Sequence, residues 1–188
     1  MNDRPQIGSA WRASSRVRVA SVRDADLFVK AHYLGKRPAV VLLCLIASVE
    51  ARDVGCIIFA APPREVEKRF GGKTWELARL YLLDDVPRNA ETWLIGRAVR
   101  HIKQHHEEVA FLVSYADPSV GHQGTIYKAS NWTFDGRTDA GRKTPRCDYV
   151  DARTGKKYGR RGNVPDGAEL KRVPRVSKLR FKLALSFS

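Results

Sequence analysis

The chain has 188 residues, and its 43% share of hydrophobic residues is enough for one domain with a buried core. Its formal net charge is +14 at pH 7, yet residues 24–136 are neutral, with 14 basic against 14 acidic side chains. The excess lies in residues 1–23, with five basic against one acidic, and in residues 137–188, with 15 against five. This split predicts a neutral body whose flanks bind a polyanion such as nucleic acid.

Apolar runs and cysteines exclude further classes of protein. No run is long and apolar enough to span a bilayer, and the first residues lack the apolar segment of a secretory signal. The three cysteines have no paired spacing, which argues against a disulfide framework or a zinc ribbon. We therefore expect a cytoplasmic protein that does not act at a membrane.

The first part of the chain predicts a strand, a helix and a hairpin. Residues 16–22 alternate polar and apolar side chains, as a half-buried strand does. Asp24 is then expected to cap a short helix. Residues 40–48 and 54–60 are strongly apolar and joined by a short polar connection, so they predict a β-hairpin in the middle of a sheet.

The next part predicts one strand, one long helix and another strand. Residues 64–72 are charged and predict a loop or a short helix, and residues 74–83 read as a mostly buried strand. Asn89 is a suitable cap for a helix over residues 90–106, whose apolar positions recur at the three-to-four spacing of one buried face. An apolar, β-branched strand follows at residues 109–113.

Reactive side chains gather directly after this strand. It ends at Ser114, Tyr115 and Asp117, and a turn containing His122 leads to a short helix over residues 124–130 and a further strand. In α/β enzymes the chemistry sits at the carboxyl end of a central strand, so we expect the catalytic site here. The structural alternative is an ordinary strand–turn–helix connection whose polar residues only cap and turn.

The C-terminal part is basic and less regular. Residues 142–167 predict a loop or a partly disordered segment, and residues 178–187 predict a late strand. We expect a catalytic core with a basic N-terminal flank over residues 1–138, and an extension over residues 139–188 that completes the domain and contacts DNA. The residues expected to contact phosphates are Arg142, Lys143, Arg146, Lys156, Lys157, Arg160 and Arg161.

Three segments carry a resemblance to a known family. WELARLYL, PRNAETWLIGRAVRHIK and VSYADPSVGHQGTIYKASNWTFDGRT resemble the phage Mom family of DNA-modification proteins, over roughly residues 28–138. With the order of the elements, this resemblance implies a GNAT-like acyltransferase fold. That fold is of the α/β class, with a mixed central sheet flanked by helices, here followed by a basic C-terminal extension.

The resemblance also implies an activity. Mom-family enzymes convert adenine in double-stranded phage DNA to an N6-carbamoylmethyl (acetamido) derivative, which protects the DNA from host restriction in the cytoplasm of the infected bacterium. GNAT folds commonly form homodimers. The alternatives are a conventional acyl-CoA-dependent N-acetyltransferase acting on a small amine or a protein, and a non-catalytic nucleic-acid-binding protein on the same scaffold.

The turn before the long helix departs from the GNAT pattern. In acetyltransferases a turn of type Gln/Arg-x-x-Gly-x-Gly/Ala cradles the pyrophosphate of coenzyme A, whereas residues 86–92 contain no glycine and Glu91 would repel the phosphates. Acetyl-CoA is therefore disfavoured, and the donor of the two-carbon fragment is not identified. Arg88, Asn89 and Asn131 are the expected cofactor-side residues; Asn131 either reads an adenine edge or caps the preceding helix.

The candidate catalytic residues each have a structural alternative. Asp117 is a base or metal ligand, or only a turn former; Tyr127 donates a proton to the leaving group, or is a core aromatic. Arg79 anchors a carboxylate or phosphate, or forms a structural pair with Glu76 or Asp117. The full candidate set is Asp117, Ser114, Tyr127, His32, Tyr33 and Arg79.

Two further expectations concern strand direction and a metal. Side chains alternate along a strand, so at most one of Ser114 and Tyr115 should face a pocket, and we expect Ser114 to do so. The resemblance to the Mom family implies a divalent, iron-like metal ion. The residues that can supply its ligands are His32, Asp117 and His122.

Overall fold

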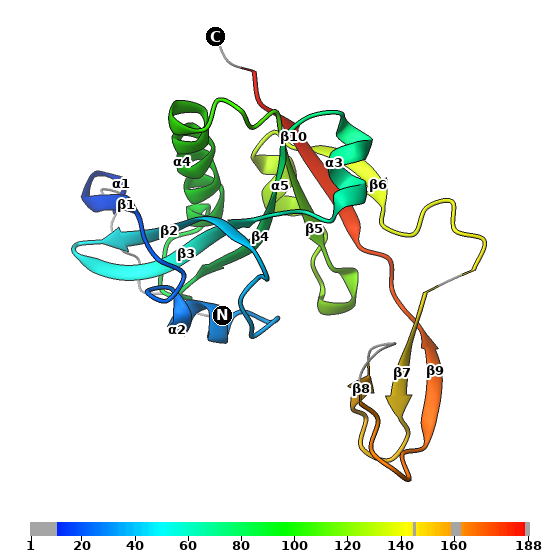
Figure 1. Cartoon of the computed structure of the whole chain (residues 1–188). Helices are drawn as coiled ribbons and strands as arrows, with labels where there is room; N and C mark the ends of the chain where they lie inside the picture. Colours follow the sequence, from blue (N-terminus) through cyan, green and yellow to red (C-terminus); the bar gives the residue numbers. More distant parts are fainter. Residues whose placement is uncertain (1–10, 145, 159–162, 187–188) are drawn as a thin grey trace.

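The computed structural model describes residues 11–144, 146–158 and 163–186, which form a seven-stranded and a three-stranded sheet (Figure 1). The large sheet has the order β1-β2-β3-β4-β5-β10-β6, and the small one β8-β7-β9. The strands of the large sheet are β1 (Ser15–Val19), β2 (Val41–Val49), β3 (Arg52–Ala60), β4 (Thr74–Leu82), β5 (Phe111–Ala116), β6 (Thr133–Arg137) and β10 (Leu179–Ala184). Those of the small sheet are β7 (Cys147–Asp151), β8 (Lys157–Tyr158) and β9 (Leu170–Pro174).

Five α-helices and one 3-10 turn accompany the sheets in the described ranges. They are α1 (Trp11–Ser14), α2 (Asp26–Ala31), α3 (Arg64–Phe70), α4 (Ala90–His105), the turn η1 (Pro118–Val120) and α5 (Thr125–Ala129). None of the described helices combines the length and the apolarity that a bilayer-crossing helix needs.

The predicted central hairpin is confirmed. β2 and β3 pair antiparallel, and only Glu50 and Ala51 separate them. Both residues have positive φ, 50° and 64°. Two-residue turns with positive φ match the right-handed twist of the flanking strands, so this turn sets the register of the two apolar runs.

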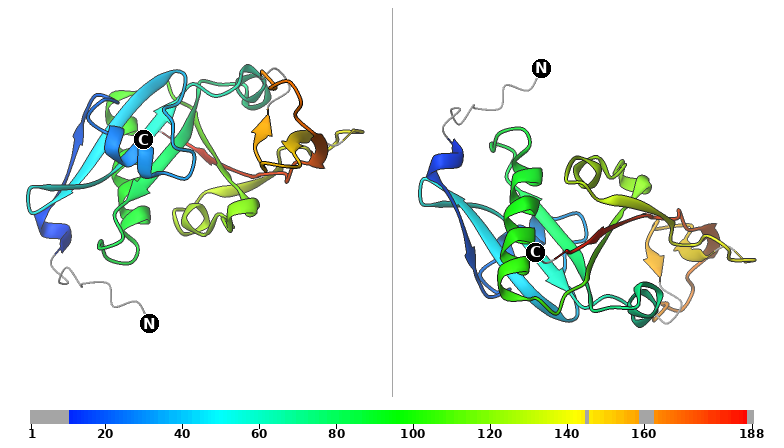
Figure 2. Two further views of the ribbon diagram at one scale, coloured as in Figure 1. Left: turned by 90° about the horizontal axis from the view of Figure 1, so that it is seen from below. Right: turned by 90° about the horizontal axis from the view of Figure 1, so that it is seen from above.

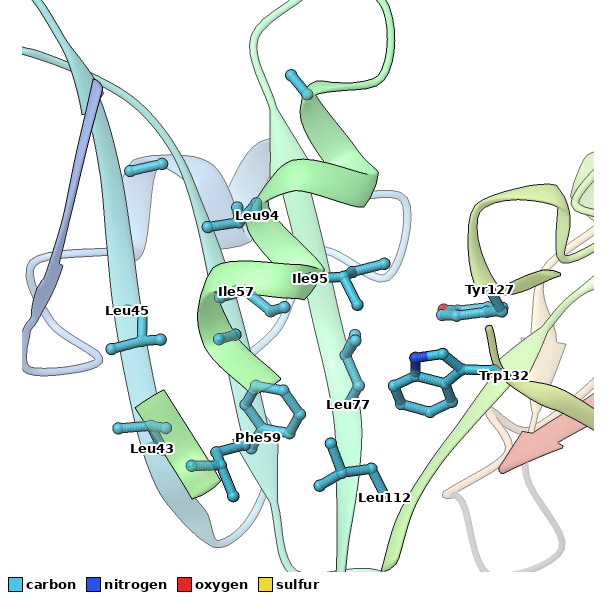
Figure 3. Packing of buried hydrophobic residues seen from close by; sticks show 14 of the residues in the cluster. Leu43, Leu45, Ile57, Phe59, Leu77, Leu94, Ile95, Leu112, Tyr127 and Trp132 are labelled. Carbon is cyan, nitrogen blue, oxygen red and sulfur yellow. The ribbon is translucent and has the colours of Figure 1, made fainter. Parts of the chain in front are cut away.

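Helices cover both faces of the large sheet. The predicted apolar stripe of α4 is confirmed: Leu94, Ile95 and Ala98 are buried in the same core cluster as Ile57 on β3 (Figure 3). On the opposite face, Val29 of α2 belongs to a separate cluster with side chains of β2 and β3. The sheet is therefore buried on both sides, which explains why β2 and β3 are almost continuously apolar.

β4 and β5 pair over only part of their length. The parallel pairing covers Thr74–Glu76 of β4 and Phe111–Val113 of β5. Against β3, Phe59 pairs with Leu77 and Ile58 with Arg79, so one residue of β4 bulges out of the ladder. A bulge bends its strand. The two strands consequently diverge beyond Glu76 and leave a gap in the middle of the sheet.

The late strand expected over residues 178–187 is confirmed, and β10 lies between β5 and β6. Its Phe181 is completely buried. Gly124 packs against this ring so closely that a Cβ atom would lie 2.2 Å from it, and Gly124 also has a φ of 75°. Both facts require glycine where the turn enters α5.

Two structural expectations were wrong. Residues 142–167 were expected to form a loop, but β7 and β8 lie there and pair with β9 in the small sheet, at the end of the molecule opposite β1 (Figure 2). Their strands are short and interspersed with charges, which hides the β pattern. Asp24 does not cap α2 either: the cap position is Ala25, and the Asp24 carboxylate accepts a hydrogen bond from the Ser21 amide.

Candidate functional site

A pocket of about 450 Å³ occupies the gap where β4 and β5 diverge. Its walls come from the end of α2, from β4 and β5, from Glu91 of α4, from residues 121–127 leading into α5, and from Lys178 directly before β10. Among the residues expected at the site, those that line the pocket are His32, Tyr33, Arg79, Ser114, His122 and Tyr127. Residues that are distant in sequence therefore come together at the carboxyl end of β5, where the sequence predicted a site.

A buried hydroxyl pair forms one wall. The Ser114 hydroxyl donates to the Leu77 carbonyl at 2.8 Å and shares a 2.8 Å hydrogen bond with the Tyr127 hydroxyl. Burial raises the pKa of Tyr127 to about 12, so the phenol keeps its proton at neutral pH. Tyr127 also packs against Trp132 and Phe181, and thus combines the expected proton-donor position with a core contact (Figure 3).

Tyr115 lines the pocket together with Ser114, although only one of the two was expected there. Strand alternation does put their side chains on opposite faces of the sheet. Because the pocket passes through the sheet between the diverging strands, it meets both faces. The expectation failed because it assumed a continuous sheet.

Glu76 is the pocket residue that sequence reasoning missed as a catalytic candidate. It is the last β4 residue paired with β5, and it lines the pocket. Burial raises the pKa of its carboxyl, although the nearby Arg79 and Lys178 act in the opposite direction. A carboxylate with a raised pKa is a stronger base than one in water. The sequence signal that could have identified Glu76 is its position as the single acidic residue within the apolar run TWELARLYL.

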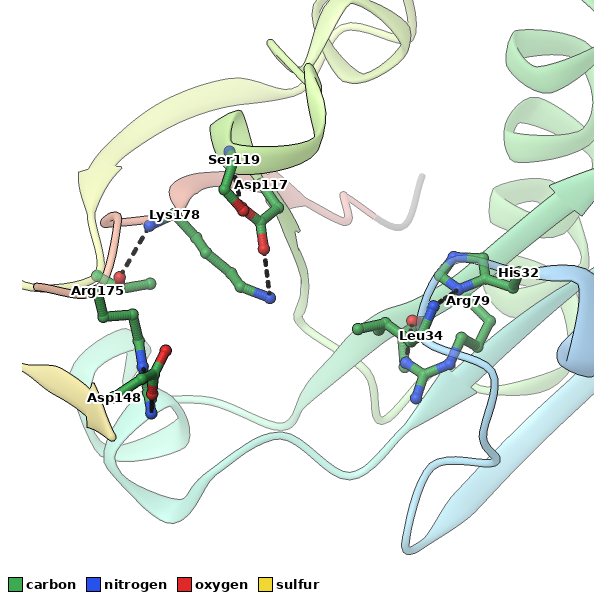
Figure 4. Close-up of polar contacts among 10 residues, drawn as sticks. His32, Leu34, Arg79, Asp117, Ser119, Asp148, Arg175 and Lys178 are labelled. Atoms are coloured by element: carbon green, nitrogen blue, oxygen red, sulfur yellow. Dashed lines mark hydrogen bonds and ion pairs between the residues drawn. The ribbon is translucent and has the colours of Figure 1, made fainter. Parts of the chain in front are cut away.

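His32, Tyr33 and His122 form an aromatic group at the α2 side. The Tyr33 ring lies 4.5 Å from that of His32 and 5.1 Å from that of His122. Burial, with further contributions from Arg79 and His122, lowers the pKa of His32 to about 4. Its Nδ1 accepts a hydrogen bond from the Leu34 amide (Figure 4). His32 is therefore neutral at pH 7, with its proton on Nε2, and offers a hydrogen-bond donor rather than a base.

Arg79 is buried without an acidic partner among the described residues. Its Nε and one terminal nitrogen donate to the Lys36 carbonyl at 3.0 and 2.9 Å, and the other terminal nitrogen donates to the Ala78 carbonyl at 2.6 Å. The pair with Glu76 or Asp117 that we considered does not form in the described part of the chain. The guanidinium instead fixes the loop after α2 against β4.

Asp117 lies beside the pocket, outside its lining. One carboxylate oxygen accepts hydrogen bonds from the Ser119 amide and hydroxyl at 3.0 and 2.6 Å, and the other pairs with Lys178 at 3.3 Å (Figure 4). Burial works against ionisation, but the contacts with Ser119 and Lys178 outweigh it and lower the pKa of Asp117. These are the contacts of a turn former that also positions Lys178, which does line the pocket.

The expected metal ligands do not form a site. No group of three or more His, Cys, Asp or Glu side chains suited to a metal ion exists in the described ranges, so His32, Asp117 and His122 are not assembled as a ligand set. His32 Nδ1 and the Asp117 carboxylate already have hydrogen-bond partners. We therefore assign no step to a metal.

The residues expected near a cofactor surround the pocket without lining it. Arg88 and Asn89 are exposed at the start of α4. Asn89 occupies the expected N-cap position, but it has a φ of 68° and its side chain makes no capping hydrogen bond. Glu91 of the same turn lines the pocket. This carboxylate opposes a pyrophosphate at the helix start, so the residues do not fit coenzyme A held in the usual way. Asn131, with a φ of 63°, is exposed at the end of α5.

The expected phosphate contacts divide into three groups. Arg142 and Lys143 are exposed in the connection before the small sheet, where Arg146 pairs with Asp139 at 3.0 Å. Lys156 and Lys157 are exposed on the small sheet itself. Arg160 and Arg161 lie outside the described residues.

The mixed sheet with a pocket at the fork of β4 and β5 defines a GNAT-like fold. An acetyltransferase of Bacillus subtilis solved with CoA superposes with a TM-score of 0.57, 10% identity and coverage of 92% of this chain and 99% of that one. The ribosomal-protein-S18-alanine N-acetyltransferase of Escherichia coli gives 0.54 at 10% identity, covering 93% and 96%. At such identities the likeness concerns the fold alone.

The family follows from sequence. The model of the Mom protein family matches residues 16–178, and the chain belongs to this family. It is also 41% identical over 61 residues to the methylcarbamoylase Mom of Escherichia phage Mu. That alignment covers 32% of this chain and 25% of the phage Mu protein. The resemblance expected from the three sequence segments is thereby confirmed.

Proposed function

We propose that this protein is a DNA-modifying transferase that places a carbamoylmethyl group on N6 of adenine. The observation that carries the proposal is the match to the Mom family over residues 16–178, a range that includes every residue lining the pocket. An enzyme that modifies a base must take it out of the stack, and a pocket of about 450 Å³ with aromatic walls suits a single base.

Glu76 and Tyr127 are the residues suited to the proton transfers. Glu76 accepts a proton from the N6 amine as the bond from N6 to the methylene carbon of an activated carbamoylmethyl donor forms. The bond from that carbon to its leaving group breaks, and the Tyr127 hydroxyl donates its proton to the leaving group. The raised pKa values of both residues match these roles, since Glu76 is a stronger base and Tyr127 remains protonated.

The neutral His32 supplies a donor for the adenine ring. Its Nε2–H can bond a ring nitrogen of the base, while the Tyr33 ring offers an aromatic contact. A positively charged His32 would stabilise the Glu76 carboxylate and make it a weaker base. Because His32 is neutral at pH 7, it does not hinder proton transfer from the N6 amine to Glu76. Double-stranded DNA as substrate also agrees with the basic flanks around a neutral body.

Mass spectrometry of nucleosides tests the proposal. DNA from cells expressing the chain should contain a modified deoxyadenosine that is absent with Glu76→Gln, and Asp117→Asn should retain part of the activity. Loss of modification with Asp117→Asn but not with Glu76→Gln would transfer the role of base to Asp117. Unmodified DNA from cells holding the soluble parent protein would disprove the proposed reaction.

The fold supports one alternative function, a conventional acetyl-CoA-dependent N-acetyltransferase. Calorimetric titration with acetyl-CoA separates the two. Submicromolar binding would favour the acetyltransferase, and the presence of Glu91 at the start of α4 leads us to expect much weaker binding.

A further inference from the structure

A group of basic side chains surrounds one carboxylate next to the pocket. Asp135 of β6 pairs with Arg180 at 2.6 Å, with Lys182 at 3.3 Å and with Arg69 of α3 at 3.4 Å. Three cations thus face one carboxylate and leave an excess of two positive charges. Arg18 and Arg52, by contrast, are each paired with one aspartate.

Burial separates the three cations into two kinds. The Asp135 and Arg180 side chains are 9% and 12% exposed, and their close contact satisfies both. Lys182 and Arg69 remain 38% and 53% exposed, so their charges face solvent. Lys182 also lies 5.5 Å from the Phe70 ring centre, which holds its stem against α3. An anion from outside the protein can reach these two cations.

The cations are arranged as a ladder that begins at the pocket. Lys178, directly before β10, and Arg180 and Lys182 within it are alternate residues of the chain. In extended backbone alternate residues lie on one face about 7 Å apart. Lys178 lines the pocket. Arg180 is directly opposite Tyr115, which also lines the pocket.

The ladder lies on the same face of the sheet as the proposed base. Lys182 is opposite Val113 on β5, and Val113 is opposite Glu76 on β4, so these three side chains share one face. A polymer that places one unit in the pocket beside Glu76 therefore has its neighbouring units next to Arg180 and Lys182.

We propose that the ladder of Lys178, Arg180 and Lys182, extended by Arg69, binds the backbone of the DNA strand whose adenine enters the pocket. The solvent-accessible Lys178, Lys182 and Arg69 meet phosphates, and the mostly buried Asp135–Arg180 pair holds them in place. This inference rests on the proposed function, since it takes the substrate to be a nucleic acid. Phosphodiesters carry one negative charge per nucleotide, and consecutive charges can meet consecutive cations of the ladder. The ladder positions the strand and reads no sequence.

Salt dependence of DNA binding tests the ladder. The probe is a fluorescent duplex with one adenine opposite an abasic site, which favours extrusion of that base. Relative to the parent, Arg69→Gln/Lys182→Gln should reduce the slope of log affinity against log salt by about 2 and weaken binding most at low salt. The matched control is Arg97→Gln/Arg100→Gln, which removes the same charge from the exposed side of α4 in the neutral body and should leave the slope unchanged.

Each outcome bears on the proposal. A slope that changes equally in both double variants, or in neither, overturns the ladder. If thermal melting shows that the double variant does not fold, Lys182→Gln alone should lower the slope by about 1, and an unchanged slope overturns the ladder. A parent protein that binds no DNA contradicts both proposals. DNA binding with the expected slopes but without modified deoxyadenosine contradicts the proposed reaction and supports the ladder.

Discussion

The large and the small sheet are built from different kinds of sequence. In the large sheet, central strands such as β3 are buried over most of their length, from Val54 to Ala60, and helices cover both faces. In the small sheet, β9 is exposed along its whole length, and Tyr158 is the buried hydrophobic residue of its described strands. The buried large sheet can hold catalytic groups rigidly and away from water. The exposed small sheet presents cations that a large, negatively charged partner can reach. Under the proposed function, the large sheet carries the chemistry and the ladder beside it, and the small sheet adds exposed cations for the DNA.

The largest expected effect is on chemistry in the large sheet. Glu76→Gln should lower the rate of adenine modification by about 10²–10⁴-fold, the usual contribution of a general base. Single-turnover measurement with the purified protein would show this as a fall in rate with DNA affinity maintained. Glu107→Gln, at the end of α4, is the matched control and should keep the parent rate. A loss below tenfold for Glu76→Gln would contradict its assignment as base.

Removal of a buried side chain should distinguish the two sheets in stability. Phe181→Ala in β10 should lower the free energy of unfolding by about 3–5 kcal/mol, because it leaves a cavity beside Tyr127 and Gly124. Val173→Ala in the exposed strand β9 should change it by less than about 0.5 kcal/mol. Denaturant titration measures both, and equal effects would mean that the small sheet is as tightly packed as the large one.

Removal of charge from the small sheet should affect DNA binding without affecting stability. Lys156→Gln, Lys157→Gln and Lys171→Gln together should reduce the salt slope of DNA affinity by as much as about 3, because each lysine is exposed and can meet a phosphate. The unfolding midpoint should stay within about 0.5 kcal/mol per substitution. An unchanged slope would restrict DNA contact to the large sheet and its ladder.

The smallest expected effect is a pH dependence at His32. Its pKa is about 4 in the folded protein and about 6.5 in an unfolded chain, so the unfolded state binds the proton first as the pH falls. The contribution of His32 to stability is complete above pH 6.5 and is lost progressively down to about pH 4. His32→Gln should therefore show a smaller loss of stability over this interval when unfolding is followed at several pH values. Identical pH profiles would show that His32 is not buried as described.

Local patterns predicted the elements with strong periodicity. The β2–β3 hairpin and α4 follow from apolar runs and from three-to-four spacing, and the late strand that became β10 was also predicted. The strands β7 and β8 were missed because their short, charged sequences depend on pairing with each other and with β9. Strands of five and two residues that are interspersed with charges leave little trace in a local pattern.

The candidate site was predicted in part. The strand-end argument correctly brought attention to Ser114 and Tyr127, which share a hydrogen bond in the pocket. Glu76 was considered only as a partner of Arg79, because a lone acidic residue in a strand carries no motif. Asp117 was expected to be the most reactive residue of its turn. In the structure its carboxylate accepts a hydrogen bond from Ser119 and forms an ion pair with Lys178, which is distant in sequence.

By itself, the sequence determined the neutral body, the basic flanks, the order of the main elements and the resemblance to the Mom family, since each is carried by composition or by residues close together in the chain. Only the tertiary structure decided which side chains meet. The divergence of β4 from β5 opens the pocket to Glu76, and the insertion of β10 between β5 and β6 brings Lys178, Arg180 and Lys182 beside it. These residues are distant in sequence. They come together only when strand pairing and burial have formed the whole sheet, so no local pattern predicts their contact.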